Sequence, residues 1–225
     1  SLEQPVRPVC LALIICTYQR KEELKRNMEV IKRSPFFDEK SDLFEKLRVY
    51  VADNASEWPI LKGSIQIFHN PNTGGSGGFR RGLEECLKER EKYGITHVIF
   101  MDDDVLVQEE TFIRLYSMLS LLREEYISSV VGGRMFCLDR KEIQSTASEI
   151  WNSGNIIHIG ENQDMRLEEN LKEMNEKSGE YTGWWFGCFP IEFARENLPL
   201  PFFLHCDDVE YGLRCGKKPI ILNGI

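Results

Sequence analysis

The sequence predicts an α/β protein built on a mostly parallel, doubly wound sheet flanked by helices. One observation is a series of short apolar runs, which suit strands that are buried on both faces. Another is that helical patterns stand between these runs, so that strand and helix alternate as they do in parallel sheets. The predicted strands cover residues 9–16, 47–52, 64–68, 96–101 and 128–136, and the predicted helices cover residues 21–33, 79–92 and 108–125.

The second half of the chain is patterned differently. Residues 139–180 are polar and irregular, with a hairpin expected at 151–155 and a charged helix at 165–177. Further on we expect a short helix after Glu210 and a small strand at 219–222. Because the chain shows no internal repeat and no clear linker, we expect one domain over residues 1–225.

Composition narrows the class of protein. The chain has 225 residues, a formal net charge of −8 and 42% hydrophobic residues, enough for a real core. An acidic chain lacks the basic footprint of a nucleic-acid binder, so no nucleic-acid partner is expected. The seven cysteines are scattered with no CxxC pair, which indicates reduced core thiols in a cytosolic protein. The apolar run 9–16 is far shorter than the ~20 residues of a membrane helix.

Three adjacent carboxylates, Asp102, Asp103 and Asp104, follow the strand predicted at 96–101. Such a cluster is costly unless a positive charge joins it. Alternate residues of an extended chain point the same way, so Asp102 and Asp104 should share a face while Asp103 points elsewhere. Two carboxylates form a partial shell for Mg²⁺ or Mn²⁺ and leave positions open for phosphate oxygens. The alternative is a solvated acidic turn, but a buried strand directly before the run favours the metal.

A glycine segment lies between the third predicted strand and the next helix. Gly74, Gly75, Gly77 and Gly78 would let the backbone approach a ligand, and the helix N-terminus would offer free N–H groups. The segment matches neither the dinucleotide-binding fingerprint nor the Walker loop. A flexible tight turn explains these glycines equally well.

Two polar residues at strand ends have two interpretations each. Arg20 could contact a diphosphate as a fixed cation or simply stand on the surface at a helix start. Asp53 could accept a hydrogen bond from a nucleotide base or serve as a turn residue.

The last candidates lie in the second half. One of Asp207 and Asp208 is expected to cap the following helix, and either could be a general base that takes a proton from an attacking hydroxyl. Trp184 and Trp185 could be core residues. If they lie on one strand they cannot both point inward, which would leave one indole free to stack on a ligand. His205 could bind a metal, but a core histidine is the simpler interpretation.

Taken together, these motifs resemble the family 2 inverting glycosyltransferases of the GT-A fold, and most of all the galactofuranosyltransferases that use UDP-galactofuranose to build cell-surface galactan. The resemblance extends from about residue 9 to the C-terminus. It rests on Thr17-x-x-Arg20, Asp53-Asn54, Asn72-x-Gly74-Gly75-Ser76-Gly77-Gly78-Phe79, Asp102-Asp103-Asp104, Trp184-Trp185 and Asp207-Asp208-x-Glu210-Tyr211-Gly212-Leu213-Arg214.

The resemblance implies a role for each candidate residue. A divalent cation, Mn²⁺ or Mg²⁺, would be bound by Asp102 and Asp104. The general base would be Asp208, with Asp207 as its rival. The acceptor platform would be Trp184 and Trp185. The nucleotide-sugar would be contacted by Thr17, Arg20, Asp53, Asn72, Gly77, Gly78 and Asp103.

The family usually supplies one more metal ligand, a histidine in a Trp-His step after the last core strand. The present sequence stops at Ile225, just before that position. We therefore expect a truncated catalytic half whose last metal ligand lies downstream. The nucleotide-binding half would cover about residues 9–105, and the acceptor and catalytic half about 106–225.

The implied partners are a UDP-sugar donor and a saccharide or glycolipid acceptor used in cell-surface polysaccharide synthesis. The implied location is the cytoplasm, with peripheral association at the inner face of the cell membrane left open. Other donors, such as a rhamnosyl nucleotide, remain open too. Two further alternatives are a nucleotidyltransferase, which should carry a basic glycine-rich loop after the first strand, and a carbohydrate-binding domain without catalysis. The sequence does not indicate an oligomeric state.

Overall fold

The computed structural model describes residues 6–173 and 178–224. Its centre is a seven-stranded sheet in the order β12-β5-β11-β4-β1-β2-β3. All neighbouring strands in it are parallel except β11, which runs antiparallel to both β4 and β5. The strands of this sheet are β1 (Leu11–Thr17), β2 (Leu47–Asp53), β3 (Ile65–His69), β4 (His97–Asp102), β5 (Val131–Gly132), β11 (Gly187–Pro190) and β12 (Ile220–Ile221). The prediction of a mostly parallel sheet is confirmed.

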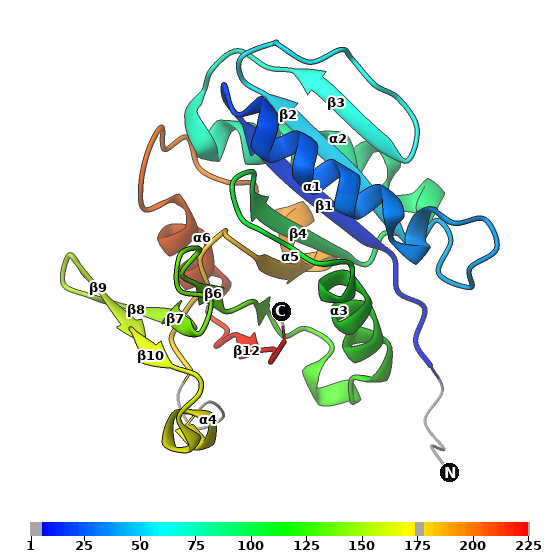
Figure 1. Ribbon diagram of the computed structural model, residues 1–225. Helices are drawn as coiled ribbons and strands as arrows, with labels where there is room; N and C mark the ends of the chain where they lie inside the picture. Colours follow the sequence, from blue (N-terminus) through cyan, green and yellow to red (C-terminus); the bar gives the residue numbers. More distant parts are fainter. Residues whose placement is uncertain (1–5, 174–177, 225) are drawn as a thin grey trace.

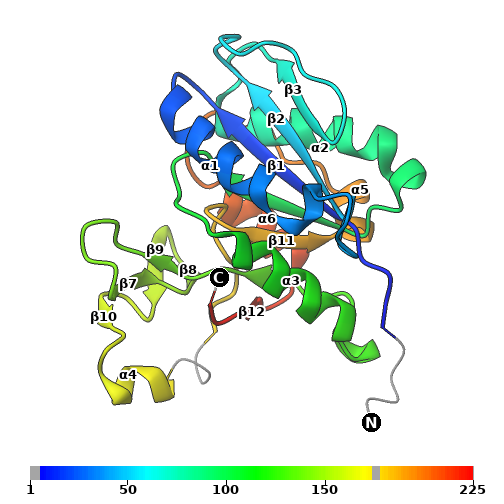
Figure 2. The ribbon, with the colours of Figure 1, turned by 45° about the vertical axis from the view of Figure 1, so that its right-hand side comes forward.

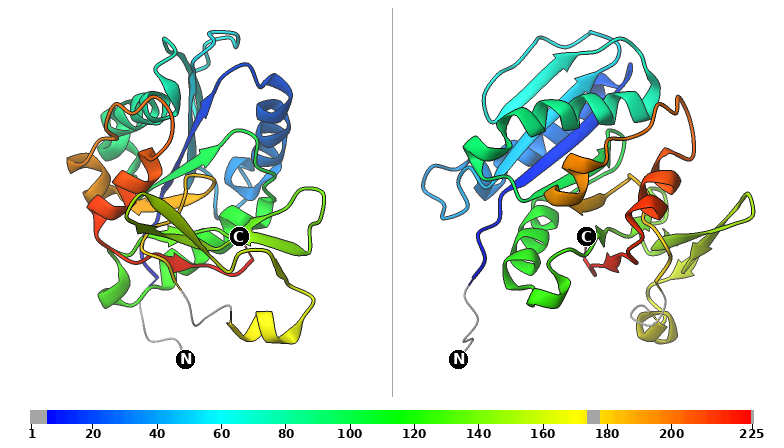
Figure 3. Two further views of the ribbon diagram at one scale, coloured as in Figure 1. Left: turned by 90° about the vertical axis from the view of Figure 1, so that its left-hand side faces the viewer. Right: turned by 180° about the vertical axis from the view of Figure 1, so that it is seen from behind.

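Helices cover both faces of the sheet, as Figures 1 and 3 show. They are α1 (Lys21–Arg33), α2 (Gly74–Tyr93), α3 (Glu109–Leu121), α5 (Ile191–Glu196) and α6 (Asp207–Cys215), with short 3₁₀ turns η1 (Pro35–Phe37) and η2 (Glu124–Tyr126). Alternate residues of β1 divide between two cores. Leu13 packs with α1 and α3 on one face, whereas Ile14 packs with α2, α5 and α6 on the other. This alternation explains why the predicted strands contain unbroken apolar runs.

Helix α2 begins at Gly74, five residues before the predicted start at Phe79. Glycine disfavours helix, so the sequence pattern hides this first turn. Packing on the sheet explains part of the glycine content. A β-carbon at Gly78 would lie 2.1 Å from Cys16 Sγ, and one at Gly82 would lie 2.4 Å from Ile14 Cγ2. The missing side chains therefore allow α2 to lie directly on β1.

The strand predicted at 128–136 is interrupted. The chain forms β5 and then β6 (Met135–Phe136), with Gly133 between them. A β-carbon at Gly133 would lie 3.1 Å from Phe186 Cβ, so the absence of a side chain at Gly133 allows the turn before β11 to lie close to this interruption. Helix α3 likewise ends at Leu121 rather than 125.

A smaller layer projects from the sheet (Figure 2). It contains β7 (Ile143–Thr146), β8 (Ser148–Asn152), β9 (Asn155–Ile159), β10 (Gln163–Asp164) and α4 (Glu168–Glu173). Strands β10, β7 and β6 form a second sheet, and β8 and β9 form the hairpin expected here. Both residues of its two-residue turn have positive φ, 50° at Ser153 and 93° at Gly154, as in the tight turns that join twisted strands. Residues 174–177 of the predicted charged helix lie outside the described residues.

Strand register determines where the site lies. Thr17 pairs with Asp53, and Cys16 pairs with Asp102, so β1, β2 and β4 end at the same edge of the sheet. Ligands of open α/β sheets bind beyond this edge. None of the helices in the described ranges has both the length and the apolar character needed to cross a membrane.

Candidate active site

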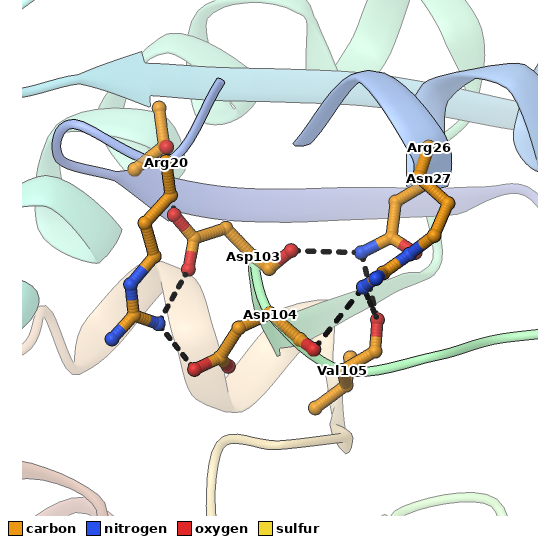
Figure 4. A network of polar contacts seen from close by, with 7 residues as sticks. Arg20, Arg26, Asn27, Asp103, Asp104 and Val105 are labelled. Atoms are coloured by element: carbon orange, nitrogen blue, oxygen red, sulfur yellow. Dashed lines mark hydrogen bonds and ion pairs between the residues drawn. The ribbon is translucent and has the colours of Figure 1, made fainter. Parts of the chain in front are cut away.

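The three aspartates at the end of β4 have three different environments. Asp102 is half-buried, Asp103 is buried and Asp104 is exposed. Thr17 Oγ1 donates to Asp103 Oδ2 at 2.7 Å, and Arg20 Nη1 donates to Asp103 Oδ1 at 3.1 Å. The same Arg20 nitrogen also binds the carboxylate of Asp104 (Figure 4). Burial raises the pKa of Asp103, while the contacts from Thr17 and Arg20 oppose that rise.

Helix α1 holds the backbone of the same turn (Figure 4). Asn27 Nδ2 donates to the carbonyls of Asp103 and Val105, both at 2.9 Å. Arg26 Nη2 donates to the carbonyls of Asp104 and Val105 at 3.3 and 3.4 Å. Sequence reasoning missed both residues. The available signal was a polar Asn27 among the apolar positions that α1 turns toward the core.

Among the residues that the structure describes, no positive side chain pairs with Asp102 in this way. Burial raises its pKa to about 8, and the nearby charges of Asp104, Asp103, Asp208 and Asp207 add to the rise. The strongest of these charges is Asp104, as expected if the two carboxylates are near each other. Two aspartates of α6 also contribute, so the end of β4 and the start of α6 converge on one acidic site.

This donor set fits a hard divalent cation. Carboxylate oxygens are the ligands that Mg²⁺ and Mn²⁺ prefer, and one or two carboxylates plus substrate phosphates commonly suffice. A cation at Asp102 would stabilise its ionised form and so offset both the burial and the repulsion that raise its pKa. No group of three or more His, Cys, Asp or Glu side chains within residues 6–173 and 178–224 is placed to hold a metal on its own. Asp102 and Asp104 could thus supply two ligands, and phosphate oxygens or water would supply the others.

Helix α6 begins at Asp207, and Asp208 follows in its first turn. Burial, followed by the charge of Asp207, raises the pKa of Asp208 to about 6. A carboxylate with this pKa is ionised at neutral pH and still accepts a proton readily, as a general base must. The expectation that one aspartate is the N-cap is wrong, because Cys206 holds that position and its side chain makes no capping bond. Within the first turn, Asp207 Oδ1 accepts from the N–H of Asp208 at 3.2 Å, and Asp208 Oδ1 accepts from the N–H of Val209 at 2.8 Å.

The backbone turns sharply before α6. His205 and Cys206 both have positive φ, 64° and 61°, which is unusual for residues other than glycine. His205 is exposed, so the expectation of a core histidine is wrong. Strained backbone of this kind is often found at functional sites.

The start of α2 is partly closed to ligands. The N–H of Gly74 donates to Asn72 Oδ1 at 3.1 Å, and the N–H of Gly75 donates to the carbonyl of Phe203 at 3.3 Å. The expectation of free N–H groups is therefore wrong at these two positions. Gly77 lies against Thr73, where a β-carbon would come within 2.1 Å of Oγ1.

Of the two interpretations of Asp53, the structure supports the turn residue. Its side chain is buried and accepts bonds from the N–H groups of Ala55 at 3.0 Å, Glu57 at 2.7 Å and Trp58 at 2.8 Å. These bonds close the loop after β2. Asn72, by contrast, is exposed beside the site.

The two tryptophans lie in a turn before β11, not on one strand, so the premise that one indole must be free is wrong. Trp184 is 4% exposed and packs edge-on against Phe100 and Tyr211. Trp185 is half-buried, and its Nε1 donates to the carbonyl of Gly133 at 2.8 Å. The turn that contains the tryptophans is bonded directly to the acidic site, because the N–H of Asp102 donates to the carbonyl of Trp184 at 3.0 Å.

Glu149 on β8 is a further acidic residue that sequence reasoning missed. It is buried, its Oε1 lies 2.9 Å from His158 Nδ1, and its charge contributes to the raised pKa of Asp208. Because the contact depends on the fold of the hairpin, no local motif marks it.

Both the parallel sheet and the acidic site at its carboxyl edge agree with the comparison to protein families. Residues 12–190, most of the chain, match the model of glycosyl transferase family 2. The chain therefore belongs to glycosyl transferase family 2.

Two curated relatives are both named galactofuranosyltransferase GlfT2. The chain is 29% identical over 171 residues to the one from Mycolicibacterium smegmatis and 30% identical over 173 residues to the one from Mycobacterium tuberculosis. Each alignment covers 70% of this chain but 26% of the relative. The chain thus spans about a quarter of the length of these relatives.

Solved structures show the same fold. A mannosyltransferase from Pyrobaculum calidifontis, in complex with GDP-Man and Mn²⁺, matches with a TM-score of 0.58 at 14% identity, covering 99% of this chain and 59% of the other. TarS 1–349 of S. aureus matches with a TM-score of 0.57 at 11% identity, covering 95% and 58%. The GT-A-like architecture expected from the sequence is confirmed.

Proposed function

We propose that the protein is an inverting glycosyltransferase that moves a sugar from a UDP-sugar to a saccharide hydroxyl, with galactofuranose as the first donor sugar to test. The observation that carries this proposal is the convergence of two acidic groups, one at the end of β4 and one at the start of α6. Family membership and the name of the curated relatives support it. Family membership also argues against the nucleotidyltransferase alternative.

The two acidic groups would have different roles. A divalent cation held by Asp102 and Asp104 would supply positive charge that stabilises the departing diphosphate. Arg20, half-exposed at the end of β1, would bind the same diphosphate through its planar guanidinium. Asn72 would lie along the nucleotide, and the exposed part of Trp185 would meet the acceptor. Thr17 is buried, so it would act by holding Asp103 in place.

Asp208 would be the general base. The acceptor oxygen attacks the anomeric carbon on the face opposite the leaving UDP. The new carbon–oxygen bond forms as the bond to the phosphate oxygen breaks, and the hydroxyl proton passes to Asp208. Attack from the opposite face inverts the configuration. The pKa of about 6 leaves Asp208 unprotonated at neutral pH, ready for this step.

Calorimetry with the full-length protein tests the proposal. UDP should bind in the presence of Mn²⁺ and more weakly without it, and Asp102→Asn should remove the metal dependence. A matched substitution at an exposed surface aspartate, Asp139→Asn, should change neither. If UDP fails to bind with or without Mn²⁺, the transferase proposal is wrong and a carbohydrate-binding domain without catalysis becomes the better explanation. If UDP does bind, a comparison of UDP-galactofuranose with UDP-galactopyranose and a rhamnosyl nucleotide would identify the donor.

A further inference from the structure

Arg20 binds the last two aspartates of the acidic run, Asp103 and Asp104. Its Nη1 donates to Asp103 Oδ1 at 3.1 Å and also to the carboxylate of Asp104 (Figure 4). Half of the arginine side chain is exposed, as is 48% of the Asp104 side chain, whereas 7% of Asp103 is exposed. The contact to Asp104 is therefore a surface ion pair next to a buried one.

The two aspartates depend on Arg20 to different degrees. Asp103 is also held by Thr17 Oγ1 at 2.7 Å, and its carbonyl is held by Asn27. Within the part of the chain that the structure describes, Arg20 is the one side chain bound to the Asp104 carboxylate. Exposed ion pairs contribute little to stability, so this contact is easily exchanged.

A divalent cation would compete with Arg20 for Asp104. It carries twice the charge of a guanidinium and prefers carboxylate oxygens. A guanidinium released from Asp104 stays tethered at the end of β1, where the diphosphate of a donor would lie. Its planar, fork-shaped set of N–H groups suits phosphate oxygens.

We propose that Arg20 is an exchangeable cation that couples metal binding to nucleotide binding: it neutralises Asp104 until a divalent cation replaces it, and it then binds the donor diphosphate. The inference rests on the proposed function. It makes metal binding favour nucleotide binding, and by reciprocity nucleotide binding favour metal binding.

The proposal requires effects of opposite sign from a single substitution. Arg20→Gln removes the competitor, so Mn²⁺ alone should bind about two- to fivefold more tightly. The same variant loses a charge-assisted contact to the diphosphate, so UDP should bind at least about tenfold more weakly to the Mn²⁺-saturated protein. An arginine that served only to stabilise the fold would not produce this pair of effects.

Calorimetry on the full-length protein measures both quantities without relying on turnover. Lys21→Gln is the matched control, because it removes the adjacent positive charge, and Lys21 pairs with Glu57 rather than with the acidic run. This control should leave both affinities unchanged. Thermal unfolding of each variant confirms that the fold is retained.

Each outcome decides a separate point. If Arg20→Gln leaves Mn²⁺ affinity unchanged or weakens it, the exchange is wrong even though the protein binds UDP. If Lys21→Gln tightens Mn²⁺ equally, a general field effect replaces the exchange. If the wild-type protein binds neither Mn²⁺ nor UDP, the proposed function itself fails, and the exchange fails with it.

Discussion

The two acidic groups of the site are supported in different ways. At the end of β4, Thr17 and Arg20 bind the carboxylate of Asp103, and the side chain of Asn27 binds its backbone carbonyl. The pair at the start of α6 follows two residues with positive φ, and Asp208 accepts a bond from the N–H of Val209, its own neighbour. Support from outside fixes the position of a charge, whereas burial without a cation raises a pKa. Asp103 and Asp104 are thus suited to binding. Asp102 has a raised pKa, as Asp208 does, but a divalent cation bound at the β4 group would oppose that rise, whereas Asp208 would stay available for proton transfer.

The largest expected effect separates these two roles. Asp208→Asn should lower the transfer rate by about 10²–10⁴-fold, because the amide cannot accept the proton. UDP affinity in the presence of Mn²⁺ should stay unchanged, since the β4 group remains intact. Rate and calorimetric measurements on the same preparation test this, with Asp139→Asn as the control. Loss of both properties together would show that the base is misassigned.

The pH dependence of transfer provides the next test. Because the pKa of Asp208 is raised to about 6, the base is ionised above that pH and protonated below it. The value of kcat/KM should therefore fall about tenfold for each pH unit below 6. A profile that stays flat down to pH 5 would contradict the assignment. Charged or titratable groups that interact with Asp208 are Asp207, Glu149, Asp102 and Tyr181.

Removing the backbone support should weaken the β4 group. Asn27→Leu keeps the branching of the side chain but removes the Asn27 donor from the carbonyl of Asp103 and one of the two donors from the carbonyl of Val105. We expect the free energy of unfolding to fall by roughly 2–4 kcal/mol. Mn²⁺-dependent UDP binding should weaken as well, measured at a temperature where the variant is folded. Glu29→Leu, at an exposed position of α1, is the control and should have little effect on either quantity.

Two buried threonines allow a finer test. Thr17→Val removes the hydroxyl that binds Asp103 and should cost about 2 kcal/mol of stability, because it leaves a buried carboxylate oxygen unpaired. Thr182 is equally buried, but its Oγ1 has no partner among the described residues. Thr182→Val should therefore be neutral or slightly stabilising. Equal costs in denaturant titrations would show that Asp103 does not depend on Thr17.

The smallest expected effect is the contribution of Asp208, at the start of α6, to the pH dependence of the protein's stability. The pKa of Asp208 rises from 3.8 to about 6 on folding, so the folded protein binds this proton more tightly than the unfolded chain does. Ionisation of Asp208 therefore costs stability as the pH rises from about 4 to about 6. At about 1.4 kcal/mol per pKa unit this shift corresponds to about 3 kcal/mol at most, and solvent screening at a partly exposed group lowers that figure. Asp208→Asn should therefore stabilise the protein at pH 7 by about 1–2 kcal/mol and by much less at pH 4. Lower stability of the variant at pH 7 would mean that the carboxylate is held more firmly than the structure indicates.

Sequence patterns predicted the parts of the molecule that depend on local chemistry. Strands β1 and β4 and helix α1 appear within two residues of the predicted bounds, because buried parallel strands require unbroken apolar runs. The convergence of Asp102 with Asp208 is consistent with the rule that ligands bind at the carboxyl edge of the sheet.

The remaining features depend on tertiary contacts. Asn27 and Glu149 act through partners about 76 and 9 residues away in the chain, and no spacing rule identifies such partners. The core interpretation of Trp184 is confirmed, whereas the argument that one indole must be free assumed a strand where the chain forms a turn. The start of α2 was missed because the glycines that allow close packing also conceal the helix.

The close packing of α2 on β1 has a consequence for how this sequence can change. Residue 78 and residue 16 share a single volume, because a β-carbon at Gly78 would overlap Cys16 Sγ. The two positions should therefore covary. In a combinatorial library over both positions, selection for folded protein should recover alanine at 78 chiefly alongside glycine at 16. The contact would then be detected as covariation between the two positions in the selected sequences.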